Sequence, residues 1–245
     1  MTTLRSLLFL FVLVVAVVGY SIAIMLLSRM VERQSLLNLA ASWSRVLLRS
    51  LKGLCGLDYR LSGIENLPPE PCILMAKHQS AWETIAAPSV IPRPQAWVLK
   101  QELMRVPFFG SALRAFHPIA IDRKAGRQAM RQLLQEGMAQ LEQGQSILVF
   151  PEGTRVAVGA AAPFNIGGAL LAQKSGAPVV PIAHNAGVFW KRRALRKIPG
   201  CIDMVIGPPI DPIGRSAKEI NALVKAWIDE TVDALPQTPT PTSAS

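Results

Sequence analysis

A histidine and a carboxylate five residues apart are the side chains of this sequence best suited to chemistry. His78 and Glu83 lie in the stretch Lys77-His78-Gln79-Ser80-Ala81-Trp82-Glu83. In one continuous helix they would point roughly 140° apart, so they can meet only if His78 lies in a turn and Glu83 in the first turn of a following helix. A carboxylate that accepts the Nδ1 proton leaves Nε2 free to act as a general base, which typically contributes about 10²–10⁴ in rate.

The same residues also have a purely structural interpretation. The segment Ser80-Ala81-Trp82-Glu83 matches the capping-box pattern, in which Ser80 begins a helix and Glu83 reaches back to it. The predicted helix then runs from Ala81 toward Ala87 and is stopped by Pro88. The spacing alone leaves open whether Glu83 orients a catalytic base or only caps a helix.

A second polar cluster, Phe150-Pro151-Glu152-Gly153-Thr154-Arg155, follows the apolar run at 146–150. Gly153 lets the backbone approach a ligand closely, and Thr154 can donate a hydroxyl hydrogen bond. Arg155 offers a planar fork suited to bidentate phosphate binding. The alternative is an ordinary polar loop at the end of a strand.

Apolar segments of strand length alternate with segments of helical periodicity along most of the chain. The predicted strands are at 58–63, 71–76, 96–99, 118–121, 146–150, 179–183 and 202–206, and the predicted helices at 31–52, 81–87, 125–143, 168–174 and 216–235. This order predicts an α/β fold with a mixed, partly parallel sheet flanked by helices. Ligands bind beyond the carboxyl ends of such strands, where His78, Lys100, Arg123 and Arg155 all fall.

The N-terminal segment is strongly apolar. Residues 7–27 contain no charge and are long enough, at about 1.5 Å per residue, to cross a hydrocarbon core of roughly 30 Å. The apolar region of a cleaved signal peptide is usually shorter, about 7–15 residues, so we predict an uncleaved membrane anchor; a helix inserted in one leaflet is the alternative. Basic residues follow the segment (Arg29, Arg33, Arg45, Arg49 and Lys52), which predicts a domain on the cytoplasmic side of the cell's inner membrane.

Three parts are expected: an anchor with an amphipathic helix (1–54), an α/β domain (55–235) and a disordered Pro/Thr/Ser tail (236–245). The helix at 31–52 can lie at the membrane interface or pack into the core.

Three widely spaced cysteines among apolar neighbours are typical of reduced buried thiols. His117 and His184 are predicted to be structural, and three scattered histidines do not make a metal site.

Four ordered blocks between about residues 55 and 210 resemble the glycerolipid acyltransferases, and most closely the 1-acylglycerol-3-phosphate acyltransferases. The blocks are His78-x4-Glu83, Lys100-Gln101-Glu102-Leu103 with Pro107 and Gly110, Phe150–Arg155, and Val180-Pro181-Ile182. The resemblance implies an enzyme without metal or cofactor that moves an acyl group from an acyl thioester, acyl-CoA or acyl carrier protein, to the free sn-2 hydroxyl of 1-acylglycerol 3-phosphate.

The resemblance also implies roles for individual residues. His78 is then the base and Glu83 its orienting carboxylate. The glycerol phosphate is contacted by Glu152, Gly153, Thr154 and Arg155, with Lys100 and Arg123 as further candidates. The chain departs from the family pattern in having Glu83 instead of Asp, Lys77 instead of Asn, and Asn165 instead of Lys.

The sequence is also compatible with other functions. The acceptor can be another lyso-lipid, such as lyso-ornithine lipid, or glycerol 3-phosphate. A catalytically inactive, membrane-anchored lipid-binding protein is the alternative of another class.

The net charge of +10 favours a polyanionic partner. The basic run at 191–197 can face anionic membrane lipids, attract an acyl carrier protein or be a solvated loop. Nucleic acid is disfavoured because the chain has no recognised binding motif.

Overall fold

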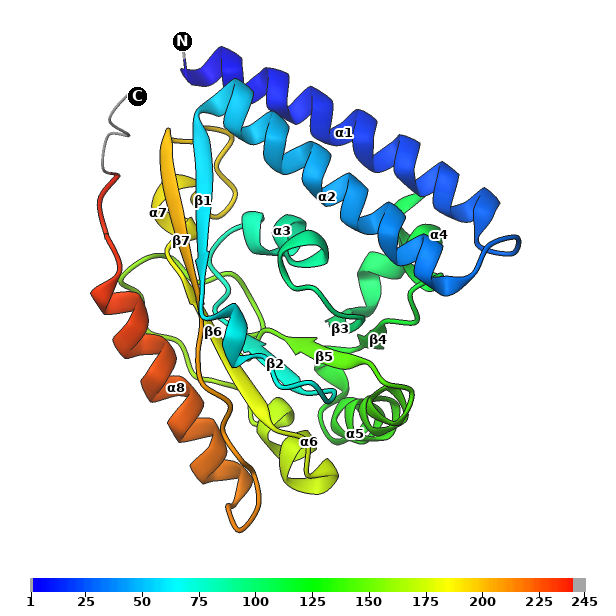
Figure 1. Ribbon diagram of the computed structural model, residues 1–245, viewed down its shortest axis with the longest axis vertical. Helices are drawn as coiled ribbons and strands as arrows, with labels where there is room; N and C mark the ends of the chain where they lie inside the picture. Colours follow the sequence, from blue (N-terminus) through cyan, green and yellow to red (C-terminus); the bar gives the residue numbers. More distant parts are fainter. Residues whose placement is uncertain (1, 240–245) are drawn as a thin grey trace.

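The computed structural model describes residues 2–239, which form a single mixed sheet covered by helices (Figure 1). The seven-stranded sheet of these residues has the order β1-β7-β6-β2-β5-β3-β4, and β6–β7 is its antiparallel pair. The strands are β1 (Leu57–Ser62), β2 (Ile73–Ala76), β3 (Gln95–Lys100), β4 (Ile119–Ile121), β5 (Ser146–Val149), β6 (Val179–His184) and β7 (Gly200–Ile206). The predicted α/β class with a mixed, partly parallel sheet is confirmed.

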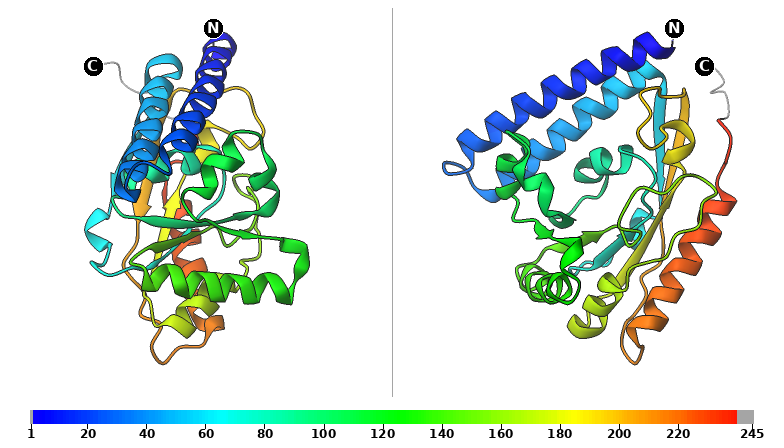
Figure 2. Two further views of the ribbon diagram at one scale, coloured as in Figure 1. Left: turned by 90° about the vertical axis from the view of Figure 1, so that its right-hand side faces the viewer. Right: turned by 180° about the vertical axis from the view of Figure 1, so that it is seen from behind.

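Helices cover both faces of the sheet, as Figure 2 shows from two further sides. The longer helices are α1 (Thr2–Leu27), α2 (Arg33–Cys55) and α3 (Trp82–Val90) over one face and α5 (Arg127–Glu142), α6 (Gly167–Ser175) and α8 (Ala217–Ala234) over the other. Shorter segments are α4 (Phe109–Arg114), α7 (Ala186–Phe189), η1 (Ile64–Asn66), η2 (Gln101–Arg105) and η3 (Arg123–Ala125). In β2, Leu74 and Ala76 join the first layer and Ile73 and Met75 the second, because successive side chains of a strand point to opposite faces.

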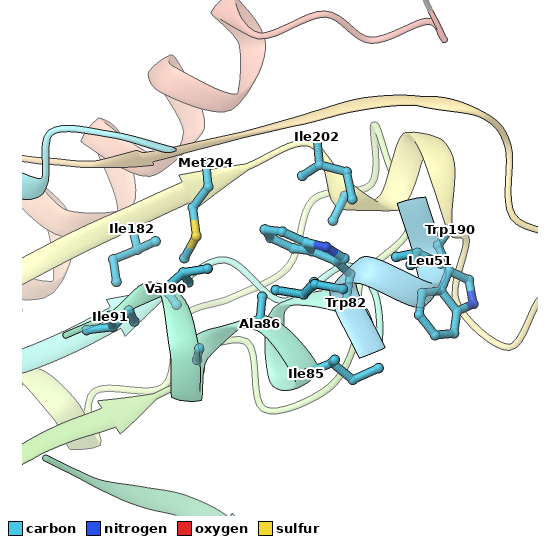
Figure 3. Packing of buried hydrophobic residues seen from close by; sticks show 14 of the residues in the cluster. Leu51, Trp82, Ile85, Ala86, Val90, Ile91, Ile182, Trp190, Ile202 and Met204 are labelled. Atoms are coloured by element: carbon cyan, nitrogen blue, oxygen red, sulfur yellow. The ribbon is translucent and has the colours of Figure 1, made fainter. Parts of the chain in front are cut away.

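The helix α3 carries the catalytic candidate Glu83 in its first turn and is packed into the core. Figure 3 shows Trp82 of α3 packed with Ile202 of β7 and Leu51 of α2, and the Trp82 side chain is fully buried. The hydroxyl of Ser44 in α2 donates a 2.6 Å hydrogen bond to the Ile85 carbonyl. The first turn of α3 is therefore fixed to both the sheet and α2.

Two predicted boundaries of α3 are wrong. The N-cap is Ala81, not Ser80, and the helix continues through Pro88 to Val90. Pro88 lies in the last turn, where a single missing amide donor is tolerated, and the burial of Ala87 and Val90 favours continuing the helix. Ser80 instead uses its hydroxyl to donate to the Trp190 carbonyl at 2.7 Å.

The two N-terminal helices pack on the α/β domain. Residues Leu47, Leu48 and Leu51 of α2 lie in the same core layer as Ile202 of β7. Of the two alternatives for this helix, the structure therefore shows packing into the core. Phe9 of α1 is fully buried and meets Trp190 edge-on, with ring centroids 5.7 Å apart. The opposite side of α1 exposes a row of apolar side chains, including Leu4, Phe11 and Leu26.

Among the described residues, α1 is the helix that is long and apolar enough to cross a membrane by length and composition. An apolar N-terminal helix of this kind suggests membrane anchoring. At the other end of the chain, the carbonyl of Pro236 accepts a 2.9 Å hydrogen bond from Asn185. Residues 240–245 of the predicted disordered tail lie outside the described part of the chain.

We expect Phe9→Ala to lower the stability of the protein by about 3 kcal/mol, because it leaves a cavity between α1 and Trp190. Phe11→Ala is the matched control, since Phe11 lies on the same helix and is 68% exposed. Thermal unfolding in detergent micelles measures both changes. Equal melting temperatures for the two variants would show that α1 is not docked through Phe9.

Candidate active site

The turn between β2 and α3 brings His78 and Glu83 together. The His78 Nδ1 lies 2.8 Å from Glu83 Oε1. The same carboxylate oxygen accepts hydrogen bonds from the backbone amides of Gln79 at 2.9 Å and Ser80 at 2.8 Å. Because a carboxylate only accepts, Nδ1 carries the proton of the neutral imidazole and Nε2 is left with its lone pair. The extra methylene of Glu relative to Asp is accommodated by the carboxylate reaching back over the turn.

Glu83 is buried and remains charged. Burial by itself raises the pKa of the Glu83 carboxyl, but the hydrogen bonds from His78 and from the Ser80 amide favour the charged form, and the pKa lies below its ordinary value. The carboxylate therefore does both of the things that the spacing allowed: it bonds the amides at the start of α3, and it holds the imidazole. The His78 ring also stacks on Phe150, with centroids 4.2 Å apart.

The Glu152 side chain is too deeply buried to contact a substrate. Its side chain is fully buried behind the turn, paired with the Lys77 ammonium, and its Oε2 accepts the His78 backbone amide at 2.6 Å. The sequence-based expectation that Glu152 contacts the glycerol phosphate is therefore corrected to a positioning contact on the backbone of His78. Lys77 is also buried and neutralises that carboxylate, which accounts for the lysine at this position.

A second buried histidine lies behind Glu83. His184, at the end of β6, accepts the Ala186 amide at Nδ1 (3.2 Å), and its Nε2–H donates to the Lys77 carbonyl at 2.8 Å. Burial lowers the pKa of His184 below its ordinary value, so the ring stays neutral despite Glu83 3.9 Å away. His184 thus fixes the backbone immediately before His78 without facing the cleft.

The cationic candidates line one cleft with His78. The cleft has a volume of about 920 Å³, and Lys100, Arg123, Gly153, Thr154 and Arg155 are among the residues at its wall. In the described range 2–239, no carboxylate lies within salt-bridge distance of the three cations. Cations that share a hollow and have no salt-bridge partner form a site for an anion.

The loop at Gly153 leaves little room for a side chain at this position. Gly153 has φ +67°, and a Cβ there would lie 3.0 Å from the Asn165 side-chain nitrogen. Asn165 donates from that nitrogen to the Pro151 carbonyl at 2.8 Å, so it orders this loop. The Val156 amide donates to the His78 carbonyl at 2.8 Å, which joins the loop directly to the catalytic turn next to Arg155.

The rest of the cleft is mainly apolar. It continues between α1, α2, α3 and α4, where its wall includes Val17, Ile24, Leu37, Trp43, Pro88, Leu113 and Phe116. The hollow therefore offers a cationic end beside His78 and an apolar arm that leads away from it.

Sequence reasoning missed the buried pair Lys77–Glu152 and left open the location of the basic run at 191–197. Arg192 and Arg193 of that run line the same cleft. The signal available for the pair was that Lys77 directly follows one apolar strand and Glu152 comes three residues after another, and that β2 and β5 are neighbours in the sheet. Lys197 is also part of the predicted basic run, yet it is 2% exposed.

We expect Lys77→Met to lower the free energy of unfolding by about 3–5 kcal/mol, because it leaves the Glu152 carboxylate buried and unpaired. The double variant Lys77→Met/Glu152→Gln should recover most of this loss, since the amide oxygen can still accept from the His78 backbone. Chemical denaturation measures all the variants. Additive losses from the two single substitutions would contradict the pairing.

The family model Acyltransferase matches residues 58–185, just over half of the chain. The 1-acyl-sn-glycerol-3-phosphate acyltransferase of Pseudomonas aeruginosa is 43% identical over 194 residues, which cover 78% of this chain and 75% of that protein. The human 1-acyl-sn-glycerol-3-phosphate acyltransferase alpha is 29% identical over 73% of this chain, and the match spans 64% of the human protein.

A solved structure has the same fold. The crystal structure of the 1-acyl-sn-glycerophosphate (LPA) acyltransferase PlsC from Thermotoga maritima superimposes with a TM-score of 0.82 and 24% sequence identity, covering 98% of each chain. From the family match and the 43% identity across most of its length, this chain belongs to the acyltransferase family that includes the 1-acyl-sn-glycerol-3-phosphate acyltransferases.

Proposed function

We propose that the protein transfers a fatty acyl group from an acyl thioester to the sn-2 hydroxyl of 1-acylglycerol 3-phosphate, which yields phosphatidate. The observation that carries the proposal is the imidazole of His78, held on buried Glu83, in a cleft with uncompensated cations beside it and an apolar arm beyond. The named relatives act on this acceptor, as their names state. The lysophosphatidate phosphate matches the cations, and its acyl chain matches the apolar arm.

The reaction follows from the protonation state of the imidazole. His78 takes the hydroxyl proton at Nε2 while the hydroxyl oxygen attacks the thioester carbonyl carbon. The Glu83 carboxylate stabilises the imidazolium through Nδ1, and its short bonds to the amides of α3 keep it in place. As the C–S bond breaks, the thiolate takes the proton back from Nε2, which regenerates the neutral base and releases the thiol.

Arg155, Lys100 and Arg123 would hold the acceptor phosphate, with the Gly153 backbone and the Thr154 hydroxyl beside it. Arg155 follows β5, Lys100 ends β3 and Arg123 follows β4, so three neighbouring parallel strands deliver the cations to one edge of the sheet. Within residues 2–239 these three cations have no carboxylate at salt-bridge distance, so a dianionic phosphate would balance their charge. In this way the phosphate fixes the distance of the glycerol hydroxyl from His78.

We further propose that α1 anchors the domain to the cytoplasmic face of the cell's inner membrane. One side of α1 is buried on the domain through Phe9 and Ile24, and the other presents apolar side chains to the surroundings. A helix bound in this way along its length is suited to lie with its exposed side in lipid. Basic residues dominate the segment after α1, which favours the cytoplasmic side. The lyso-lipid then reaches the cleft from the leaflet.

Glu83→Gln tests the mechanism. The amide can still accept from the turn, but it cannot neutralise an imidazolium, so we expect kcat to fall by about 10²-fold with little change in melting temperature. His78→Ala should lose about 10²–10⁴ in kcat. His117→Asn is the control, because His117 is an exposed histidine at φ +49°, which asparagine tolerates. Full turnover in Glu83→Gln would reduce Glu83 to a helix cap.

Arg155→Lys tests the phosphate assignment. Loss of the planar fork should raise KM for lysophosphatidate about tenfold and leave KM for the acyl thioester unchanged. Arg127→Lys in α5, outside the cleft, is the control. Steady-state assays of the purified protein should include lyso-ornithine lipid and glycerol 3-phosphate as acceptors. An unchanged KM for lysophosphatidate would place its phosphate elsewhere.

A further inference from the structure

The loop of residues 191–197 between α7 and β7, here called the basic loop, lies on the other side of the His78 strand from the proposed acceptor cations. His78 lies in the turn that follows strand β2, and β2 has β6 on one side and β5, β3 and β4 in turn on the other. Arg155, Lys100 and Arg123 come from the β5–β3–β4 side. The basic loop follows β6 and α7, so the chain enters it from the β6 side of β2.

The basic loop is joined to the catalytic turn through Trp190 and is stabilised by contacts of its own. The Ser80 hydroxyl donates to the Trp190 carbonyl at 2.7 Å, and Trp190 Nε1 donates to the Ala194 carbonyl at 3.1 Å. The buried Lys197 ammonium donates to the Leu195 carbonyl at 2.9 Å and lies 4.5 Å from the Trp190 ring centroid. These contacts fix the loop relative to Ser80, two residues from His78.

The four exposed cations of the basic loop are not equivalent. Arg192 and Arg193 line the cleft that contains His78, whereas Lys191 and Arg196 do not. Within residues 2–239, no carboxylate lies within salt-bridge distance of Arg192 or Arg193. Arg193 adopts φ +60°, an uncommon backbone conformation for arginine. The cleft therefore has a second uncompensated cationic group besides the one proposed for the acceptor.

We propose that Arg192 and Arg193 bind the phosphate of the 4′-phosphopantetheine arm of the acyl donor. The inference rests on the proposed function, which brings two anionic substrates to His78 at once. Two phosphates held by one cluster would repel each other, whereas two clusters on opposite sides of β2 separate them and direct both reacting groups to the imidazole. Coenzyme A and acyl carrier protein share this phosphorylated arm, so one site serves either donor.

A lipid surface is the competing occupant. The Lys197 backbone amide donates to the Ser6 hydroxyl of α1 at 3.0 Å, so the basic loop lies beside the helix that we assign to the membrane. Anionic headgroups would attract all four exposed cations of the loop by similar amounts. Donor binding involves the two that line the cleft, and this difference separates the two occupants.

The experiment compares two double variants of the full-length protein in detergent micelles. Arg192→Gln/Arg193→Asn removes the cleft-lining charges, with asparagine chosen because it tolerates the backbone at 193. Lys191→Gln/Arg196→Gln removes the same charge from the same loop outside the cleft. Each is assayed with three donors that carry the same acyl chain: acyl-CoA, acyl-[acyl carrier protein], and acyl-pantetheine, which has no phosphate.

The proposal expects the cleft-lining variant to raise KM about tenfold, or about 1.4 kcal/mol, for the two phosphorylated donors. KM for acyl-pantetheine and for lysophosphatidate should not change, and the other variant should match the unmodified protein with all three donors. Unchanged melting temperatures show that both variants are folded.

Other outcomes overturn the proposal. An equal loss with all three donors means that the loop only supports the turn. A loss confined to acyl-CoA assigns the contact to its nucleotide phosphates. Equal losses in both variants, with weaker binding to phosphatidylethanolamine–phosphatidylglycerol vesicles, assign the loop to lipid. Failure of the proposed function is distinct, because the unmodified protein would then transfer acyl groups from none of the donors.

Discussion

The charged carboxylate of Glu83, buried under the turn after β2, is the interaction on which the proposed chemistry depends. A buried carboxylate is costly unless it is well bonded, and here the imidazole of His78 and the amides of Gln79 and Ser80 supply the bonds. The same bonds start α3 and fix the tautomer of His78. Helix initiation and the activation of a base are therefore a single arrangement of atoms.

The sheet supplies two further constraints around that carboxylate. Glu152, at the end of β5, holds the His78 backbone and is neutralised by Lys77, while His184, at the end of β6, bonds the Lys77 carbonyl. The strands on both sides of β2 thus hold the same turn. Because each of these groups is buried, a shift of the turn would leave a polar group without its partner, which favours one geometry of the imidazole.

The N-terminal helices connect this site to its lipid environment. They share a core layer with β7 and α3, and they also form part of the apolar arm of the cleft. The proposed membrane anchor and the proposed binding surface for the acyl chain are therefore neighbouring parts of one unit. This arrangement would let a lyso-lipid move from the leaflet to His78 without exposing its chain to water.

Local sequence was enough to predict the α/β class, the turn at His78 and the carboxylate of Glu83. Apolar runs, helical periodicity and the capping pattern each extend over a few neighbouring residues, so they can be recognised without knowing the tertiary structure. It could not predict the partner of Glu152, the burial of Lys197 or the packing of α1 on Trp190, since these contacts join residues that are 75 or more positions apart. Likewise, the basic run at 191–197 looked uniform in sequence. Only the tertiary structure decided that two of its arginines line the cleft, because the strand order of the sheet determines which chain segments converge on His78.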